Sequence, residues 1–251
     1  MKRSLNLATI LSGVLMILLF WLGLSWLLNS PVMPSPIDVI PIFIFSMAGD
    51  LGIHFLASTG RVLASITLAV ITAVPAGLAL GQMPSVNRIF DPLIAIIYPI
   101  PKIVFLPVIY ILLGITDISK IFLIAVIVFF QILVVVRDEA SGLHPELILS
   151  VRSIGAGRRA LFRFVYIPAS LPAVLTAVRI SIGTAVAVLF IAEQSLTTWG
   201  LGYYIIVETY QVLLYPEMYA GILGMSLLGL SLYFLVDYLE RKVNRHLYLD
   251  N

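Results

Sequence analysis

The sequence predicts an all-α integral membrane protein with six transmembrane helices. Of its 251 residues, 61% are apolar and 11% are charged, whereas a soluble domain is about 45–50% apolar and about 25% charged. The mean hydropathy is +1.08. Apolar runs of about 20 residues, enough to cross a hydrocarbon core of ~30 Å, recur along the chain. These runs are continuous and do not alternate with polar residues, which favours helices over barrel strands.

The six expected spans begin near the N-terminus. The first follows Lys2 and Arg3, the basic start of a secretory signal, but its apolar run exceeds the 7–15 residues of a signal core and no A-x-A site follows. We therefore expect a retained signal-anchor helix. The spans are Leu7–Leu28, Val62–Gly81, Pro92–Gly114, Ile118–Val136, Pro172–Ala192 and Met218–Tyr238.

The segment between the first two spans, PVMPSPIDVIPIFIFSMAGDLGIHFLAST, is apolar but interrupted by Pro, Asp and Gly. An interfacial helix suits this pattern better than a seventh span. The expected organisation is a first helix with an interfacial segment over 1–57, a helical core over 58–238 and a tail over 239–251. Within the core, the longest polar connection covers 137–171.

The basic residues indicate an orientation. Eleven of the fifteen Lys and Arg residues fall in four segments on one side, 1–6, 82–91, 137–171 and 239–251. The positive-inside rule then places both termini in the cytoplasm. His54 and Arg61 are expected at the outer interface, with no chemistry assigned to them.

Composition excludes several functions. A net charge of +2 without a basic domain does not indicate nucleic-acid binding. The chain has no cysteine and three widely spaced histidines, so no metal site is expected. No H-E-x-x-H, G-x-S-x-G or G-x-x-x-x-G-K-[ST] pattern occurs, so neither catalysis nor nucleotide binding by a P-loop is expected.

Residues 152–168, RSIGAGRRALFRFVYIP, hold four of the basic residues. A helix is predicted to begin at Pro145. Leu147, Val151 and Ile154 then form one apolar stripe, and Gly155 supplies a break before a second short helix. Such an element can lie on the anionic inner leaflet or dock in a groove of a soluble partner.

This loop resembles the cytoplasmic signature of ABC-importer permeases, EAA-x3-G-x9-I-x-L-P. Leu149-Ser-Val stands at the EAA positions, Gly155 is the glycine, and Val165, Ile167 and Pro168 close the pattern. The glutamate is replaced by Leu149, so the polar contact that it makes in relatives is not expected.

Four further stretches resemble sulfonate/taurine/nitrate-type permeases, in the same order over 33–245. They are MPSPIDVI, HFLASTGRVLAS, YPIPKIVFLPVIYILLGITDISK and AEQSLTTWGLGYYI. Relatives often carry proline where this chain has Gln131, which predicts a straighter fourth span. The resemblance implies a type I ABC-importer permease fold with a cytoplasmic coupling helix.

The resemblance also implies partners. Two permease copies, expected to be identical, would form the pathway in a bacterial or archaeal inner membrane. Two cytoplasmic ATPase subunits would bind the ATP and Mg, and an external binding protein would deliver the solute. The arginines would pair with the ATPase or with lipid phosphates, or would only orient the loop. The expected coupling residues are Leu147, Val151, Arg152, Ile154, Gly155, Ala156, Arg158 and Arg159.

Lys102 and Arg179 fall inside predicted spans, where ionisable groups are costly and usually face a cavity or a partner. We hypothesise that they attract an anion. Pro99 and Pro101 would bend the same span as a hinge or as a static kink, and Glu193 is a further pathway candidate. The alternative for Arg179 is a structural pair with Glu193 or with helix carbonyls.

The family resemblance is compatible with two substrate classes. A small anion such as a sulfonate, taurine, nitrate or bicarbonate fits the intramembrane cations. Some relatives instead carry a heterocyclic vitamin or its precursor. A channel or secondary transporter is a weaker alternative because the sequence shows neither an internal repeat nor a filter-like loop.

Overall fold

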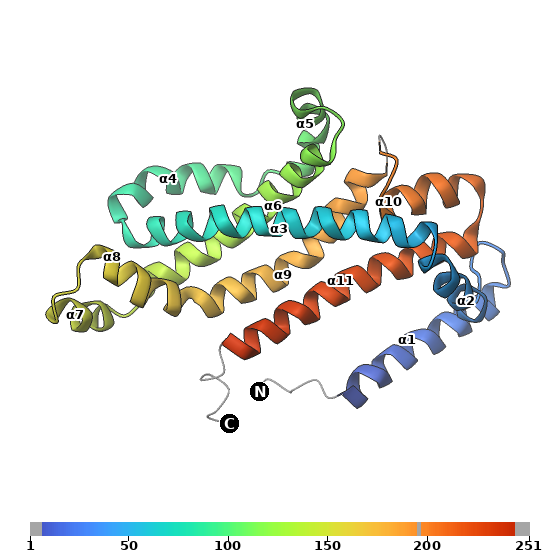
Figure 1. The fold of residues 1–251 in the computed structure, drawn as a ribbon, viewed down its shortest axis with the longest axis horizontal. Helices are drawn as coiled ribbons and strands as arrows, with labels where there is room; N and C mark the ends of the chain where they lie inside the picture. Colours follow the sequence, from blue (N-terminus) through green and yellow to red (C-terminus); the bar gives the residue numbers. More distant parts are fainter. Residues whose placement is uncertain (1–6, 195–196, 244–251) are drawn as a thin grey trace. The chain divides into compact units, whose positions relative to one another are not determined.

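The computed structural model describes residues 7–194 and 197–243, apart from the side chains of Leu7, Pro145, Leu147 and Arg158. All regular elements of this described part are helices (Figure 1). The chain divides into two compact units. The first comprises Met1–Ala57 with Glu193–Ser226, and the second comprises Ser58–Ala192 with Leu227–Asn251.

The first unit contains α1 (Leu7–Leu28), α2 (Pro36–Met47) and the start of α3 (Asp50–Gln82). Its later part contains α10 (Leu201–Tyr203), the π-helical η3 (Tyr204–Thr209), η4 (Tyr210–Val212) and the start of α11 (Tyr215–Val243). Ser35 caps α2 by accepting from the backbone N–H of Asp38, and Pro36 occupies the first turn, where its missing N–H is harmless. As expected from the sequence, α2 is a short apolar helix.

Helix α1 is held at one end. Trp21 Nε1 donates to the Pro34 carbonyl at 3.0 Å, and its ring stacks on Tyr219 with centroids 5.6 Å apart. Ser25 Oγ donates to the Met33 carbonyl at 2.8 Å. None of the apolar window of α1 is buried within the chain. This helix is therefore held near its C-terminal end by Trp21 and Ser25, and the rest of it has the surface of a lipid-facing span.

The second unit contains the rest of α3 and α11 together with the elements between them. These are α4 (Pro84–Ile97), η1 (Lys102–Phe105), α5 (Leu106–Leu113), α6 (Asp117–Ser141), α7 (Pro145–Ser153), α8 (Arg158–Leu161), the π-helical η2 (Phe162–Tyr166) and α9 (Ile167–Glu193).

Small residues let α3 and α6 pack closely. A Cβ on Gly77 would lie 2.9 Å from Val136 Cβ, and one on Gly81 would lie 2.6 Å from the Arg137 carbonyl oxygen. Gln82 donates to the Ala140 carbonyl in the same seam. Spans associate through such close approach because lipid supplies no hydrophobic force between them.

The core of this unit continues from α6 to α9 and on to α11. Gln131 Nε2 of α6 donates to Thr184 Oγ1 of α9 at 3.2 Å. A Cβ on Gly229 of α11 would contact Val186 of α9 at 3.9 Å. Fully buried apolar residues fill the interior, including Val128, Ile132, Val136, Ile182 and Ala185.

The described helices supply five or six spans against the six predicted, and one of the predicted spans is built differently. Five described helices are long and apolar enough to cross a membrane. A sixth crossing is possible if Pro84–Ile97 and Lys102–Leu113 count as one span, although these two segments are bent by 82°. The expected single helix Pro92–Gly114 is therefore wrong. Pro99 and Pro101 lack N–H donors and disfavour helical backbone in the residues before them, so the helix breaks where a kink was expected.

Two boundaries also differ from the prediction. Helix α3 begins at Asp50 and not near Val62, because DLGIHFLASTG contains no proline to stop it. Helix α4 begins at Pro84, inside what was expected to be a loop. Helix α6 is continuous through Gln131 and contains no proline.

Candidate functional site

The loop between α6 and α9 contains the predicted short helix, α7. Pro145 begins the helix after His144, Glu146 lies in its first turn, and Arg152 lies in its last turn. These charges match the helix dipole at both ends. The helix ends before Gly155, whose φ of +90° is a left-handed conformation that costs any other L-residue about 1–2 kcal/mol. The predicted helix and its break are confirmed.

The exposed residues of α7, its C-terminal turn and the start of α8 include apolar and basic side chains, beside the exposed Glu146, Ser150 and Ser153. Ile154 is 83% exposed and Leu149 is 62% exposed, and Arg152 and Arg159 are also exposed. We call these four residues the loop-helix surface. Val151 and Ala156 are only partly exposed. The side chains of Leu147 and Arg158, two of the predicted coupling residues, lie outside the described part. Sequence periodicity indicated Ile154 but missed Leu149, which stands at a position where relatives have a glutamate.

The loop-helix surface belongs to the second unit and is followed in the chain by buried residues of that unit. Helix α8 runs into the π-helical η2 and then into α9 without a gap. Leu161 is 2% exposed, and Val165 and Tyr166 are buried as well. Figure 1 shows α7 and α8 at the end of the second unit where α3 passes into α4. Buried residues therefore connect the chain that follows α7 to α9.

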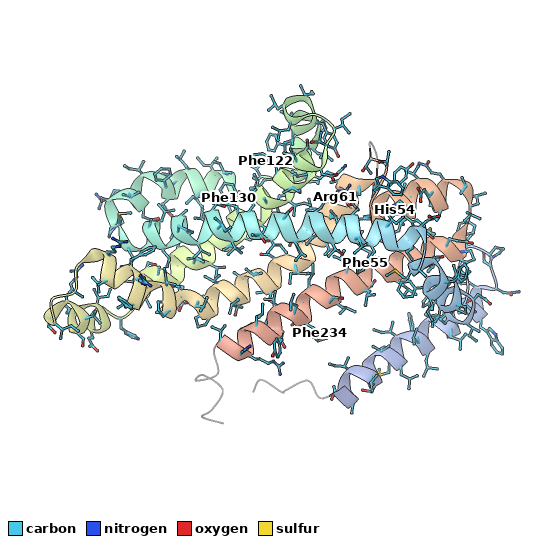
Figure 2. All side chains as sticks on the ribbon, in the orientation of Figure 1. His54, Phe55, Arg61, Phe122, Phe130 and Phe234 are labelled. Carbon is cyan, nitrogen blue, oxygen red and sulfur yellow. The ribbon has the colours of Figure 1, made fainter. Side chains whose placement is uncertain are left out.

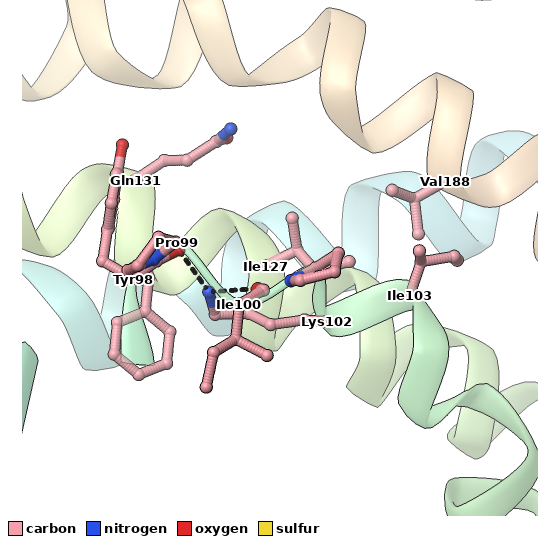
Figure 3. A pocket seen from close by; sticks show the side chains of 10 residues that line it. Tyr98, Pro99, Ile100, Lys102, Ile103, Ile127, Gln131 and Val188 are labelled. Atoms are coloured by element: carbon pink, nitrogen blue, oxygen red, sulfur yellow. Dashed lines mark hydrogen bonds between the residues drawn. The ribbon is translucent and has the colours of Figure 1, made fainter. Parts of the chain in front are cut away.

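A second site lies at the break between α4 and η1. Lys102 Nζ lies 3.0 Å from the carbonyl oxygens of Ile97 and Tyr98 and 3.3 Å from that of Ile100 (Figure 3). It also lies 4.7 Å from the centroid of the Phe130 ring. The last carbonyls of a helix have no partner within the helix and carry partial negative charge. The ammonium therefore caps α4 where the span is broken.

Lys102 also lines a cavity of about 330 Å³. The predicted pathway residues Pro99 and Pro101 line the same cavity, together with residues of α6 and α9 (Figure 3). No carboxylate occurs in this lining. The buried Oε1 of Gln131 has no hydrogen-bond partner in the described part of the chain. The lining residues are Tyr98, Pro99, Ile100, Pro101, Lys102, Ile103, Ile127, Phe130, Gln131 and Val188.

Arg179, the other intramembrane cation, lies elsewhere in the second unit. Its Nη1 contacts Asp237 Oδ1 at 2.9 Å and Glu240 Oε2 at 3.2 Å. The expected pairing with Glu193 is therefore wrong, because two carboxylates on the facing turns of α11 are within reach. Glu193 is fully buried in the first unit and accepts from the N–H of Gly202 at 3.1 Å.

Arg61, to which the sequence assigned no chemistry, is buried within the second unit. Its Nε and Nη2 lie 2.9 Å and 2.7 Å from Asp117 Oδ1. Lys120, one helical turn after Asp117, is only 2% exposed and lies 3.8 Å from the same oxygen. These contacts join α3 to the start of α6. The D-x-x-K spacing shows that Asp117 and Lys120 share a face of α6, but it does not show that Arg61 meets them.

His54 is also buried, at 1% exposure, within the first unit. Its Nε2 lies 3.1 Å from Glu208 Oε2, and its Nδ1 lies 3.0 Å from both the N and the O of Gly200. Aromatic rings of Trp199, Tyr203 and Tyr204 surround it (labelled His54 in Figure 2). His54 therefore ties the start of α3 to the segment that follows α9.

Burial raises the pKa of the Tyr204 hydroxyl, which stays protonated at neutral pH.

A helical chain with several apolar spans, one of them broken, has the architecture of an integral membrane protein. In the described part, no group of three His, Cys, Asp or Glu residues could hold a metal ion. The fold is that of the type I ABC-importer transmembrane subunit. An inward-facing structure of the MetNI methionine ABC transporter matches with a TM-score of 0.64 at 20% identity, covering 78% of this chain and 97% of that chain.

The chain belongs to the family of binding-protein-dependent transport system inner membrane components, whose model matches residues 65–245. The taurine transport system permease protein TauC of Escherichia coli K12 is 31% identical over 204 residues, which cover 78% of this chain and 74% of that protein. The formylaminopyrimidine transport permease protein ThiX of Halalkalibacterium halodurans is 26% identical over 243 residues, covering 96% of each chain.

Family membership confirms the predicted class. The chain is a permease subunit of an ABC importer, an inner membrane component and not an enzyme, and the ATPase is a separate subunit. Because the family is binding-protein-dependent, it works with a substrate-binding partner.

Proposed function

We propose that two copies of this chain form the membrane pathway of an importer for a small anion such as a sulfonate, taurine, nitrate or bicarbonate, driven by ATPase subunits that bind α7. The single observation that carries the coupling role is the loop-helix surface. Exposed apolar and basic side chains lie on α7, on the turn after it and at the start of α8, and Leu161 at the end of α8 is buried. The proposed coupling set is the eight residues predicted from the sequence, with Leu149 added.

The chemistry of this surface fits a groove with an acidic rim. Exposed Ile154 and Leu149 supply apolar anchors, and such anchors in a helix–groove contact contribute most of the affinity. Arg152 and Arg159 supply charge for the rim. In the proposed mechanism, ATP and Mg bind between two cytoplasmic ATPase subunits, and their closure moves both α7 helices and hence α9.

This mechanism requires α7 in the cytoplasm, together with both termini, as the basic residues predict. The opposite side would then receive the external binding protein and its solute. The orientation is testable because the chain contains no cysteine. We expect a membrane-impermeant maleimide to label Val212→Cys in intact cells and Ile154→Cys only after permeabilisation. Labelling of Ile154→Cys from outside contradicts the proposal.

The substrate class is inferred from the cavity at the broken span. Lys102 is a cation in a lining without a carboxylate, which suits an anion. The relative that transports taurine, a sulfonate, supports this class. The alternative is a heterocyclic vitamin precursor, which the formylaminopyrimidine permease favours. If ethanesulfonate inhibits uptake by the importer and a formylaminopyrimidine does not, the anion class is supported. The opposite result supports the vitamin precursor.

The coupling role is tested by replacing Ile154 with Asp in the complex with its ATPase subunit. Because Ile154 is 83% exposed, the permease itself should fold normally. A buried charge in the docking groove should lower the affinity for the ATPase by about tenfold or more. The matched control is Val212→Asp, since Val212 is also an exposed β-branched residue but lies far along the chain in η4.

The readout is the amount of ATPase subunit that co-purifies with the tagged permease from detergent. Wild type and Val212→Asp should retain the ATPase, and Ile154→Asp should lose most of it. Equal retention by Ile154→Asp and wild type would show that α7 is not the gripped element.

A further inference from the structure

The side chain of Lys102 bridges the break between α4 and η1, and η1 and α5 also pack against α6. An ammonium group has three N–H donors, and Lys102 has three carbonyl acceptors, on Ile97, Tyr98 and Ile100. The linker itself contributes little, because Pro99 and Pro101 have no N–H. The backbone bonds near the break are Ile100 N to Ile97 O at 3.2 Å and Val104 N to Pro101 O at 3.1 Å.

The three bonds of Lys102 serve two different parts of the chain. Those to Ile97 and Tyr98, at 3.0 Å, cap the end of α4. The bond to Ile100 is longer, at 3.3 Å, and reaches the linker that turns the chain by 82°. A cap alone needs only the first two bonds. The third holds the linker against α4, and it is the easiest of the three to exchange.

The same ammonium lines the cavity of about 330 Å³. This volume equals roughly ten water molecules at about 30 Å³ each, which is enough for a small organic anion. The lining compensates the charge with carbonyl dipoles and the face of Phe130, and no lining carboxylate neutralises it. A cation in such surroundings attracts an anion more strongly than it would in water.

We propose that Lys102 is a latch that the transported anion opens. This inference rests on the proposed function. A sulfonate or similar oxyanion entering the cavity accepts one N–H of Lys102 in place of the Ile100 carbonyl. A charge-assisted bond of this kind is shorter and stronger than the bond to a neutral carbonyl. The linker loses its side-chain bond and keeps the backbone bond from Ile100 N to Ile97 O, a weaker tie that lets α5 change its angle to α4. Substrate binding thus alters the shape of the broken span.

Broken spans in transporters commonly carry the substrate site at the break, because unwound backbone and helix ends are exposed there. The structure adds a specific link between occupancy and conformation. The group that recognises the anion also holds the turn, so Lys102 cannot satisfy both fully. A neutral solute of the same shape leaves the latch closed, which makes charge the signal.

The test measures a distance across the break. Ile96 on α4 and Leu112 on α5 are 65% and 74% exposed, and the chain has no native cysteine, so Ile96→Cys and Leu112→Cys accept spin labels selectively. The permease is purified with its ATPase subunit in lipid nanodiscs. Ethanesulfonate and nitrate are titrated as anionic probes, taurine as a sulfonate that is a zwitterion without net charge, and ethyl methyl sulfone serves as a neutral control.

We expect at least one of the anions to shift the distance distribution, and the neutral sulfone to leave it unchanged. Lys102→Met should show the shifted or broadened distribution without ligand, and any remaining response should need at least tenfold more anion. Lys102→Arg keeps a cation and should keep part of the response. Lys242→Met removes a charge at the exposed end of α11 and should behave as wild type.

Two results overturn the latch. One is an anion response in Lys102→Met equal to that of wild type, and the other is no change in wild type with any anion of the panel. The amount of bound ATPase is measured in the same samples. Retained ATPase with no anion effect rejects the latch alone, whereas loss of the ATPase from wild type rejects the proposed function.

Discussion

Arg179 Nη1 lies 2.9 Å from Asp237 Oδ1, and this ion pair joins α9 to α11 within the second unit. Glu240 Oε2 is 3.2 Å from the same nitrogen, and Arg241 Nε contacts Asp237 Oδ2 at 2.9 Å. Thr176 Oγ1 donates to Glu240 Oε1 at 3.1 Å. An intramembrane arginine with two carboxylate partners is a clamp between helices. Its charge is matched, in contrast to that of Lys102.

Replacing Arg179 with Gln should therefore destabilise the fold. Asp237 and Glu240 would remain in the helix interface without their cation, and removing one member of a buried ion pair costs about 3 kcal/mol. The measurement is thermal unfolding in detergent, in which Tm should fall by several degrees. Arg179→Lys, which keeps the charge but not the planar guanidinium, should lose less.

The same variant separates the clamp from the pathway role predicted from the sequence. If Arg179→Gln keeps the wild-type Tm but loses uptake, Arg179 faces the solute. Adding Glu240→Gln to Arg179→Gln should restore part of the lost stability, because it removes a carboxylate left without its cation.

Gly81 controls the approach of α3 to α6. A Cβ at this position would meet the Arg137 carbonyl oxygen at 2.6 Å and Ala140 Cβ at 2.7 Å, and neither backbone can yield easily. Gly81→Ala should lower the free energy of unfolding by about 1–3 kcal/mol. The control lies in the same helix, since a Cβ on Gly60 would meet nothing within 4 Å. Gly60→Ala should be neutral or stabilise by about 0.5 kcal/mol. Equal melting of the two variants would contradict this account of the seam.

Asp117 joins two buried cations. Replacing it with Asn removes the carboxylate that contacts Arg61 and Lys120, which are 5% and 2% exposed. We expect a loss of about 2 kcal/mol in unfolding free energy, the range for hydrogen bonds to charged groups. Asp138 is equally exposed, at 62% against 61%, but its partner Arg137 also contacts Asp91. Asp138→Asn should thus cost less than about 1 kcal/mol. Chemical unfolding of both variants decides the point, and similar losses would refute the special role of Asp117.

Gly155 ends the loop helix. Its φ of +90° disfavours any side chain, although a Cβ there would meet nothing within 4 Å. Gly155→Ala should leave the global Tm unchanged while it distorts the turn that presents Ile154. We expect roughly tenfold weaker binding of the ATPase, which corresponds to the strain of about 1–2 kcal/mol. Gly157→Ala, at an open position without a left-handed φ, is the control. If both variants bind the ATPase alike, the turn geometry is not required for docking.

Much of the architecture could be predicted because it depends on local pattern. Apolar runs of membrane length indicated the spans, although α3 extends earlier and α4 begins before its predicted start. Pro145 and Gly155 bounded the loop helix correctly, since start and stop signals act within one turn. The motif around Gly155 also identified the family that the comparison confirms.

Pairing between distant residues could not be predicted in this way. Arg179 meets Asp237 58 positions away, and His54 meets Gly200 146 positions away. The sequence assigned no partner to His54 or Arg61, but folding buries both. Pro99 and Pro101 indicated a bend, whereas the size of the break and the three carbonyls around Lys102 are visible only in the folded chain. Solvent preference and turn chemistry act along a short stretch of chain, so residue order is enough to predict them. The partner of a buried charge depends on which helices pack together, and that is known only once the tertiary structure has formed.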